Sequence, residues 1–395
     1  MAPPVVLFGA FDRHNFGDLL FPHIAAALLP GRELRVAGLA ERDLRPFGGH
    51  AVQALHRLAQ QGQLAGAQLL HAGGEILGCT ARQAAVMLLQ PEEVDATLSY
   101  IEQHPEDEAR WQRAVTGTGA TMPYVASRRE WPMLVRVVFA ASGGTQLAAL
   151  PPAWRDEVLQ RLAAADAVSV RDAVTQATLQ AAGVNAALLP DPAVMTRDLF
   201  GPRIQACGAQ GPVAALRAAW PGGYLAAQFS AEFGDDRALD ALARELEAAV
   251  AATGLGLVLF RAGAAPWHDD AGMLVRLAQR LARPPHLFES LDLWHLCALL
   301  AHARAYAGSS LHGRIVAAAF GVPVVGLLKP GETQDTGKVA AYARTWETPL
   351  QPLLASPDGL AAALQRSLAG GVTPRQAQAA RWVSAYRAGF AALMP

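Results

Sequence analysis

The chain has 395 residues, 52% of them hydrophobic and 17% charged, which is the composition of an ordered globular protein rather than a disordered one. Its 33 basic and 34 acidic residues give a formal net charge of -1, so bulk electrostatics do not point to nucleic-acid binding and leave only a local basic groove open. The length exceeds that of one ordinary domain and favours two domains of roughly 200 residues each.

The N-terminal residues lead directly into an apolar run at residues 5–11, which predicts a first strand rather than a signal peptide. The longest nearly charge-free stretch, residues 315–328, is too short to span a membrane. Cys79, Cys207 and Cys297 lack the spacing of a disulfide framework or a zinc site. We therefore expect a cytoplasmic protein with no transmembrane segment and no bound metal, and contact with a membrane surface stays open.

Strand-like apolar runs alternate with helical windows over the first half of the chain. Strands are predicted at residues 5–11, 33–39, 67–72, 134–141, 167–170 and 186–189, and helices at residues 18–29, 52–61, 154–165 and 173–182. This alternation is typical of a parallel sheet covered by helices on both faces. Residues 75–131 interrupt it with prolines, glycines and an acidic patch, and predict a helical insertion.

The loop after the first strand contains Asn15, Gly17 and Asp18. In an open parallel sheet, ligands bind outside the carboxyl ends of the strands, so this loop is a candidate binding segment. The alternative is a structural turn with Asp18 as a helix cap. The loop lacks the G-x-G-x-x-G pattern, and a bound dinucleotide is therefore not predicted.

Two more strand ends in the first half carry candidate residues. Gly73, Gly74 and Glu75 follow the third strand, where paired glycines permit a ligand to approach the backbone closely; a structural tight turn is the alternative. Arg171 and Asp172 follow a later strand, and a buried structural pair that anchors the next helix is the alternative to a role in binding.

A stretch rich in glycine and proline, residues 201–223, is predicted to separate the first domain from a second alternating series. The second series has strands at residues 224–229, 256–261, 286–289, 303–307 and 323–328, and helices at residues 237–253, 271–281, 293–300 and 313–320. A last helix is predicted from Thr373, as N-cap, and Pro374. The predicted domains are residues 1–200 and 201–372, followed by the helix at 373–395.

The segment at residues 308–314 is the most informative in the chain, because it joins a strand end to a helix N-terminus. It places Ser309, Ser310, His312, Gly313 and Arg314 in one short loop. Backbone N–H groups, hydroxyls and a guanidinium are suited to hold a phosphate or carboxylate, and an imidazole can move a proton beside it. The pattern predicts chemistry on an anion.

A second loop of the same domain, residues 261–270, follows a strand and precedes a helix. Arg261 and His268 are candidates for the same site. Asp269 and Asp270 are better explained as caps of the following helix.

Four blocks of the chain, taken in order, resemble the pattern of the polysaccharide pyruvyltransferase family. They are residues 9–18, 73–75, 169–192, and 309–313 with the Gly-Val-Pro at 321–323. His268 with Asp270, and Lys338 with Val339, also resemble features of its second domain. The family often has arginine where this chain has Ser310.

The resemblance implies a GT-B-like α/β fold, in which two Rossmann-like doubly wound domains face a cleft and a C-terminal helix packs back toward the first domain. It also implies transfer of a pyruvyl group from phosphoenolpyruvate to two hydroxyls of a sugar, glycan or lipid-linked sugar, which forms a cyclic ketal. Such a reaction belongs to exopolysaccharide or cell-envelope biosynthesis and needs no cofactor beyond phosphoenolpyruvate as co-substrate.

The resemblance also assigns roles to residues. His312 and Asp18 are expected to be catalytic. The second domain is expected to bind the donor through Ser309, Ser310, Gly313, Arg314, Arg261, His268 and Lys338. The first domain is expected to face the acceptor with Asn15, Gly17, Gly73, Gly74, Glu75 and Arg171.

Two other functions fit the same architecture. One is a glycosyltransferase that uses a nucleotide-sugar donor, whose diphosphate would also bind at helix N-termini. The other is a relative of the family redirected to another acceptor or to binding without catalysis. The sequence gives no oligomeric state.

Overall fold

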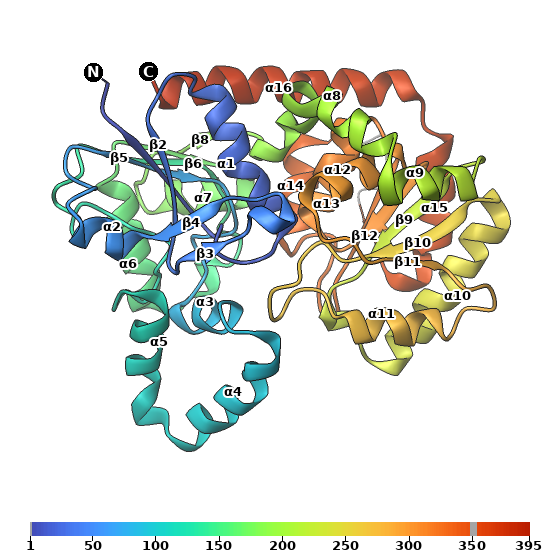
Figure 1. Ribbon diagram of the computed structural model, residues 1–395, viewed down its shortest axis with the longest axis horizontal. Coiled ribbons are helices and arrows are strands. Elements are labelled where there is room, and N and C mark those ends of the chain that lie inside the picture. Colours follow the sequence, from blue (N-terminus) through green and yellow to red (C-terminus); the bar gives the residue numbers. More distant parts are fainter. Residues whose placement is uncertain (1, 348–353) are drawn as a thin grey trace. The chain divides into compact units, whose positions relative to one another are not determined.

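The computed structural model describes residues 2–347 and 354–395 and divides the chain into two compact units (Figure 1). The first unit comprises Met1–Pro192 and Arg387–Pro395, and the second comprises Ala193–Tyr386. The C-terminal residues thus pack with the first unit: an added Cβ at Gly389 would lie 2.6 Å from Cγ of Leu189. The predicted boundary at residue 200 falls inside a helix of the second unit.

The first unit is built on an eight-stranded sheet with the order β3-β4-β2-β1-β5-β6-β7-β8. The strands are β1 (Val5–Phe8), β2 (Leu34–Gly38), β3 (Arg42–Asp43), β4 (Ala51–Ala54), β5 (Gln68–Ala72), β6 (Arg136–Ser142), β7 (Ala167–Val170) and β8 (Ala187–Leu188). All neighbouring strands pair in parallel except β3 with β4. The central strand β1 is buried throughout, as expected for a parallel sheet with both faces covered.

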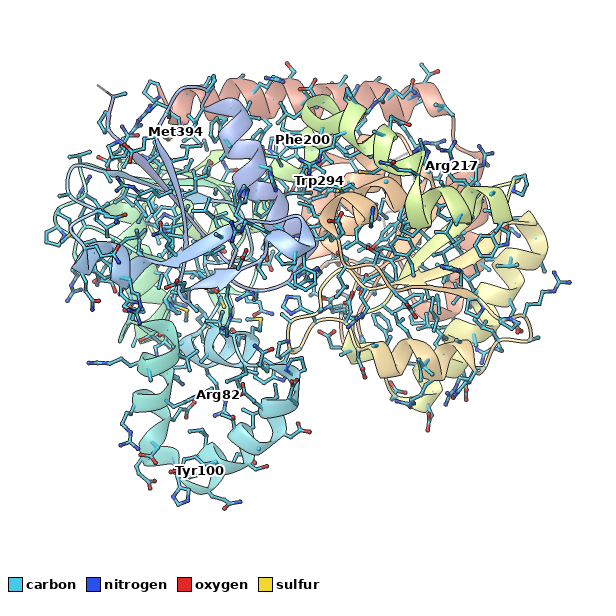
Figure 2. The ribbon with its side chains drawn as sticks, in the orientation of Figure 1. Arg82, Tyr100, Phe200, Arg217, Trp294 and Met394 are labelled. Atoms are coloured by element: carbon cyan, nitrogen blue, oxygen red, sulfur yellow. The ribbon has the colours of Figure 1, made fainter. Side chains whose placement is uncertain are left out.

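The helices of the first unit are α1 (Phe16–Leu28), α2 (Leu55–Gln60), α3 (Ala81–Met87), α4 (Val94–Gln103), α5 (Glu108–Thr116), α6 (Pro152–Ala163) and α7 (Ala173–Ala181). Helices α3, α4 and α5 form the insertion between β5 and β6, and Figure 1 shows α4 and α5 extending away from the sheet. Arg82 on α3 pairs with Glu108 on α5 at 3.1 Å, and Tyr100 on α4 is exposed near the far end of this arm (Figure 2).

The second unit contains a six-stranded parallel sheet with the order β11-β10-β9-β12-β13-β14. Its strands are β9 (Tyr224–Gln228), β10 (Gly256–Phe260), β11 (His286–Phe288), β12 (Ala305–Gly308), β13 (Val324–Leu327) and β14 (Leu354–Ala355). Its helices are α8 (Thr196–Gly208), α9 (Gly211–Ala219), α10 (Asp236–Thr253), α11 (Ala271–Ala278), α12 (Leu293–His302), α13 (Leu311–Ala319), α14 (Lys338–Trp346) and α15 (Leu360–Ala369); α16 (Val372–Leu393) ends in the first unit.

The structure contains β3, α14, β14 and α15, which were not predicted, and it also differs from the predicted elements elsewhere. Residues 52–54, predicted as the start of a helix, lie in β4, whose alternating burial matches a strand paired with β2. Residues 201–223, predicted as a separating stretch, lie largely in α8 and α9. The last helix begins at Val372, so Thr373 lies inside it rather than at its N-cap.

Tertiary packing explains why α8 and α9 form despite their glycines and prolines. Phe200 on α8 packs edge-on against Trp294 on α12 with ring centroids 5.2 Å apart (Figure 2). The Arg203 guanidinium lies 3.8 Å from the centroid of the same indole. Pro212 lies in the first turn of α9, where its missing N–H leaves no intrahelical bond unmade.

Candidate active site

The loop between β12 and α13 is held in place by hydrogen bonds to neighbouring strand ends. The Ser310 side chain caps α13 by accepting from Gly313 N at 3.1 Å, and Ser310 N donates to Oε1 of Gln228 at 2.8 Å. The Ser309 hydroxyl accepts from Ser230 N at 3.0 Å and donates to the Ser230 hydroxyl at 3.2 Å. Both hydroxyls therefore have structural partners, and the donor contacts expected of them stay predictions.

Gly313 permits a close approach between α13 and Tyr306 on β12. A Cβ at position 313 would lie 2.6 Å from the Tyr306 hydroxyl, which itself donates to the Ser310 carbonyl at 3.1 Å. The need for glycine here is steric, and it fixes the first turn of α13 over the strand end. Binding of the donor at Gly313 stays a prediction.

His312 is the second residue of α13 and is 7% exposed. It lies at the carboxyl edge of the second sheet, the edge at which the strands end and where open parallel sheets bind ligands. An imidazole in this position can exchange a proton with a bound molecule. Its catalytic role stays a prediction.

Arg314 is buried completely and forms a two-pronged ion pair with Glu347 at the end of α14, with Nε 2.7 Å from Oε1 and Nη2 bonded to Oε2. Gly326 on β13 makes room for the guanidinium, since a Cβ there would lie 3.0 Å from Nη1. The donor-binding role expected of Arg314 stays a prediction, and the structure gives this cation a buried partner within the protein.

The β10–α11 loop is anchored by Asp269. One carboxylate oxygen accepts from Ala262 N at 2.6 Å, and the other accepts from Nε2 of Gln228 at 2.7 Å. Because Gln228 in turn accepts from Ser310 N, Asp269 is linked to the loop that carries His312. Asp270, not Asp269, caps α11, by accepting from Gly272 N at 2.8 Å.

Burial raises the pKa of Asp269 to about 7 from its ordinary 3.8, against the lowering effect of its hydrogen bonds. The folded protein thus holds this proton more tightly than the unfolded chain does. The free energy of unfolding should therefore fall as pH rises between about 4 and 7, and then level off. In Asp269→Asn this contribution is absent. The melting temperature of the wild type should therefore fall relative to that of the variant across this range; a difference that is the same at pH 5 and pH 8 contradicts the assignment.

Three further polar side chains lie in the loops at this sheet edge. Arg261 is the first residue after β10 and is partly buried, and its side chain makes no hydrogen bond or ion pair with any residue in the described ranges. His268 donates from Nδ1 to the Pro266 carbonyl at 3.1 Å. Lys329, two residues after β13, pairs with Glu232 at 2.5 Å. Lys338, the lysine predicted to bind the donor, begins α14, whereas Lys329 was not predicted.

In the first unit, the β1–α1 loop is closed by Asn15, the N-cap of α1, which accepts from Gly17 N at 3.2 Å. Asp18 is not the cap but lies in the first turn and is 5% exposed. Sequence reasoning missed Asp12, a buried carboxylate that accepts from Leu39 N at 2.6 Å and from the Tyr124 hydroxyl at 3.0 Å. These bonds fix the loop against β2 and the insertion.

Gly73 and Gly74 follow β5 with φ of 89° and 91°, a conformation that favours glycine. A Cβ at Gly73 would lie 3.1 Å from the rings of Phe21 and Pro192, and one at Gly74 would lie 3.6 Å from a carboxylate oxygen of Asp18. The turn therefore lies beside Asp18, as the acceptor-side hypothesis requires. Its contact with an acceptor stays a prediction.

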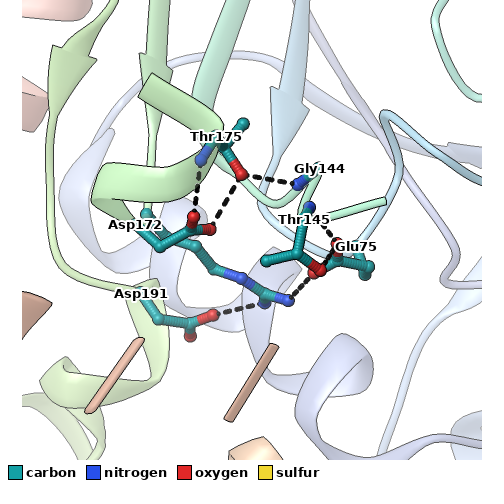
Figure 3. Close-up of polar contacts among 7 residues, drawn as sticks. Glu75, Gly144, Thr145, Asp172, Thr175 and Asp191 are labelled. Carbon is teal, nitrogen blue, oxygen red and sulfur yellow. Dashed lines mark hydrogen bonds and ion pairs between the residues drawn. The ribbon is translucent and has the colours of Figure 1, made fainter. Parts of the chain in front are cut away.

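Arg171 is 2% exposed and joins three strand ends of the first unit (Figure 3). Its guanidinium pairs with Asp191 after β8 at 2.8 Å and with Glu75 after β5 at 2.5 Å. Glu75 also accepts from Thr145 N at 2.8 Å, whereas Asp172 caps α7 through Thr175 N at 2.8 Å. The predicted Arg171–Asp172 pair is thus replaced by a wider cluster, in which Glu75 keeps about a quarter of its side chain exposed.

Within the described ranges, no group of three or more His, Cys, Asp or Glu side chains is arranged to hold a metal ion. Among the same residues, no helix is both long enough and apolar enough to cross a membrane.

A family model described as polysaccharide pyruvyl transferase matches residues 127–328, just over half of the chain. The chain belongs to this family. The match includes Arg171, the β10–α11 loop and the segment from Ser309 to Arg314, and it makes this protein a member of a transferase family. A search of curated protein sequences found no match.

Solved structures show where the fold recurs. An α,α-trehalose 6-phosphate synthase from Burkholderia multivorans has a TM-score of 0.54 and 17% identity, covering 99% of this chain and 98% of its own. The UDP-GlcNAc 2-epimerase of Neisseria meningitidis has a TM-score of 0.53 and 10% identity, covering 99% of both chains. The UDP-GlcNAc 2-epimerase of Methanocaldococcus jannaschii has a TM-score of 0.51 and 11% identity, covering 97% of this chain and 99% of its own. These likenesses confirm the GT-B-like fold, and the fold alone.

Proposed function

We propose that this member of the family transfers a pyruvyl group from phosphoenolpyruvate to two hydroxyls of one carbohydrate and forms a cyclic ketal. Family membership supports the reaction class. The observation that carries the assignment is Arg261, a guanidinium at the carboxyl edge of the second sheet that has no partner among the described residues. The carbohydrate would be a glycan precursor of the cell envelope or an exopolysaccharide, handled in the cytoplasm, with no further cofactor.

Phosphoenolpyruvate carries a carboxylate and a phosphate, and both are bound well by a guanidinium. The other described cations near this edge have partners, since Arg314 pairs with Glu347 and Lys329 pairs with Glu232. The position at which the family often has arginine is Ser310, which caps a helix. Arg261 is therefore the cation best suited to replace that charge.

In this reaction a proton from His312 adds to the methylene carbon of phosphoenolpyruvate, which becomes a methyl group and leaves an oxocarbenium-like centre at C2. One sugar hydroxyl bonds to C2 and a second displaces the phosphate, so the C2–O bond to phosphate breaks and inorganic phosphate leaves. One hydroxyl proton returns to His312 and the other goes to phosphate. Asp18 is proposed to assist from the acceptor side, as the family resemblance implies.

Arg261→Ala should weaken phosphoenolpyruvate binding by roughly 10- to 100-fold, because a charge-assisted hydrogen bond contributes about 1.5–3 kcal/mol. Calorimetric titration of the full chain with phosphoenolpyruvate measures this directly. Arg304→Ala is the matched control. Arg304 is exposed and lies just before β12, at the end of the sheet where the strands begin, so its loss should leave binding of phosphoenolpyruvate unchanged.

Two results would change the proposal. Unchanged binding by Arg261→Ala would move the donor to another cation. If wild-type protein bound no phosphoenolpyruvate at millimolar concentration but bound UDP-GlcNAc, the donor would be a nucleotide sugar instead.

A further inference from the structure

Trp267, in the β10–α11 loop, combines two unfavourable features. Its side chain is 49% exposed, and its backbone has φ of 62°. Water contact with an indole is unfavourable, and the left-handed backbone region is costly for a bulky residue. Among the described non-glycine residues, positive φ occurs elsewhere only at Ala141.

The loop holds this conformation firmly on both sides of Trp267. His268 N donates to the Ala265 carbonyl at 3.1 Å, and Asp269 N donates to the Gly263 carbonyl at 3.2 Å. The carboxylate of Asp269 binds Ala262 N from within the loop and Gln228 from β9. A glycine at 267 would adopt the same backbone without strain, and a polar side chain would be better solvated. The fold alone therefore gives no reason for tryptophan.

We propose that the exposed indole of Trp267 is a stacking platform for the apolar face of a sugar ring of the carbohydrate substrate. The flat, amphipathic indole suits the C–H groups on one face of a pyranose. Strained, exposed residues of this kind are characteristic of ligand-binding sites.

The location of the loop supports a sugar as the ligand. Trp267 lies between Arg261 and Asp269 in sequence, in the loop that hydrogen-bonds through Gln228 to the segment carrying His312. An attacking hydroxyl must come within roughly 3–3.5 Å of the donor carbon, so the ring that carries it must lie close to the donor site. The identity of the sugar as the acceptor rests on the proposed function, whereas stacking itself does not.

The first test is a fluorescence titration of the full chain with the methyl glycosides of glucose, galactose and mannose, because an exposed indole reports directly on stacking. The wild type should show a saturable change in tryptophan emission with at least one of these glycosides. Trp267→Ala should lose this change. Trp267→Phe keeps an aromatic ring but has no indole to report at this position, so it should bind the glycoside without the change in emission. Trp154→Ala is the matched control, since Trp154 is 38% exposed on α6 of the first unit and its loss should leave the response intact.

A second test separates sugar binding from donor binding. Trp267→Ala should raise the acceptor KM at least tenfold and leave calorimetric binding of phosphoenolpyruvate unchanged. Equal loss of phosphoenolpyruvate binding, no emission change with any of the three glycosides, or an equal response to UDP alone would each overturn the stacking proposal. Failure of the wild type to bind phosphoenolpyruvate, with the glycoside response intact, would instead overturn the proposed function.

The backbone strain has its own readout. Trp267→Gly and Trp267→Ala both remove the indole, but only glycine takes φ of 62° freely. The glycine variant should therefore melt about 2–4 °C higher than the alanine variant. An alanine variant that melts at the same temperature or higher would show that Trp267 is not held in a strained conformation, and it would overturn the proposal that this strain is kept for ligand binding.

Discussion

Replacing His312 with alanine is expected to lower turnover by roughly 10²–10⁴-fold, the usual contribution of one general acid or base. The proposed reaction requires a proton at the methylene carbon of phosphoenolpyruvate, and His312 is the imidazole in the first turn of α13, at the carboxyl edge of the second sheet. Release of inorganic phosphate from phosphoenolpyruvate, with an acceptor that supports wild-type turnover, measures the loss.

Binding distinguishes a catalytic role from a structural one. His312→Ala should bind phosphoenolpyruvate within about threefold of the wild type, which corresponds to less than roughly 0.7 kcal/mol. His286→Ala is the control, because His286 is exposed at the start of β11, at the opposite edge of the same sheet. Full turnover by His312→Ala, or a loss explained entirely by weaker donor binding, would remove His312 from the chemistry.

The alternating pattern of apolar runs and helical windows was sufficient to predict the central part of both sheets. Strands such as β5, β7, β9 and β10 are short, apolar and bounded by turn residues, so local sequence specifies them. Element ends and exceptions depend on distant packing. β4 forms because it pairs with β2, and α8 forms because it packs on α12.

The sequence predicted where the candidate site residues lie along the chain, but not which residues they contact. The sequence places Ser310, Arg314 and Arg171 at strand ends, but their partners lie 82, 33 and 96 residues away, at Gln228, Glu347 and Glu75. Such pairings are set by the order of the strands in the sheet, which residue types do not reveal. This is why the sequence listed both Arg314 and Arg261 as donor-binding cations without indicating that Arg314 is paired with Glu347 inside the protein.

The exposed Trp267 illustrates the same limit. Nothing in the segment from Arg261 to Asp270 indicates a positive φ at tryptophan, because local sequence predicts glycine or asparagine in that region. The hydrogen bonds of His268 N and of Asp269 across the loop explain how the conformation is held.

Removal of Asp191 should cause the largest loss of stability among the substitutions considered. Asp191 is fully buried and pairs at 2.8 Å with Arg171, which is itself 2% exposed. In Asp191→Ala the guanidinium keeps Glu75 but loses its buried partner, and breaking a buried pair from one side costs about 3–5 kcal/mol. Urea unfolding of the full chain, followed by tryptophan emission and by circular dichroism, should show the first unit unfolding at lower denaturant.

Glu33→Ala provides the matched comparison within the first unit. Glu33 pairs with Arg35 at 2.5 Å, but its side chain is 62% exposed, and exposed pairs contribute at most about 1 kcal/mol. The contrast separates burial from charge, because each substitution removes one carboxylate from one arginine. If Asp191→Ala were no less stable than Glu33→Ala, the cluster around Arg171 would not hold the strand ends together.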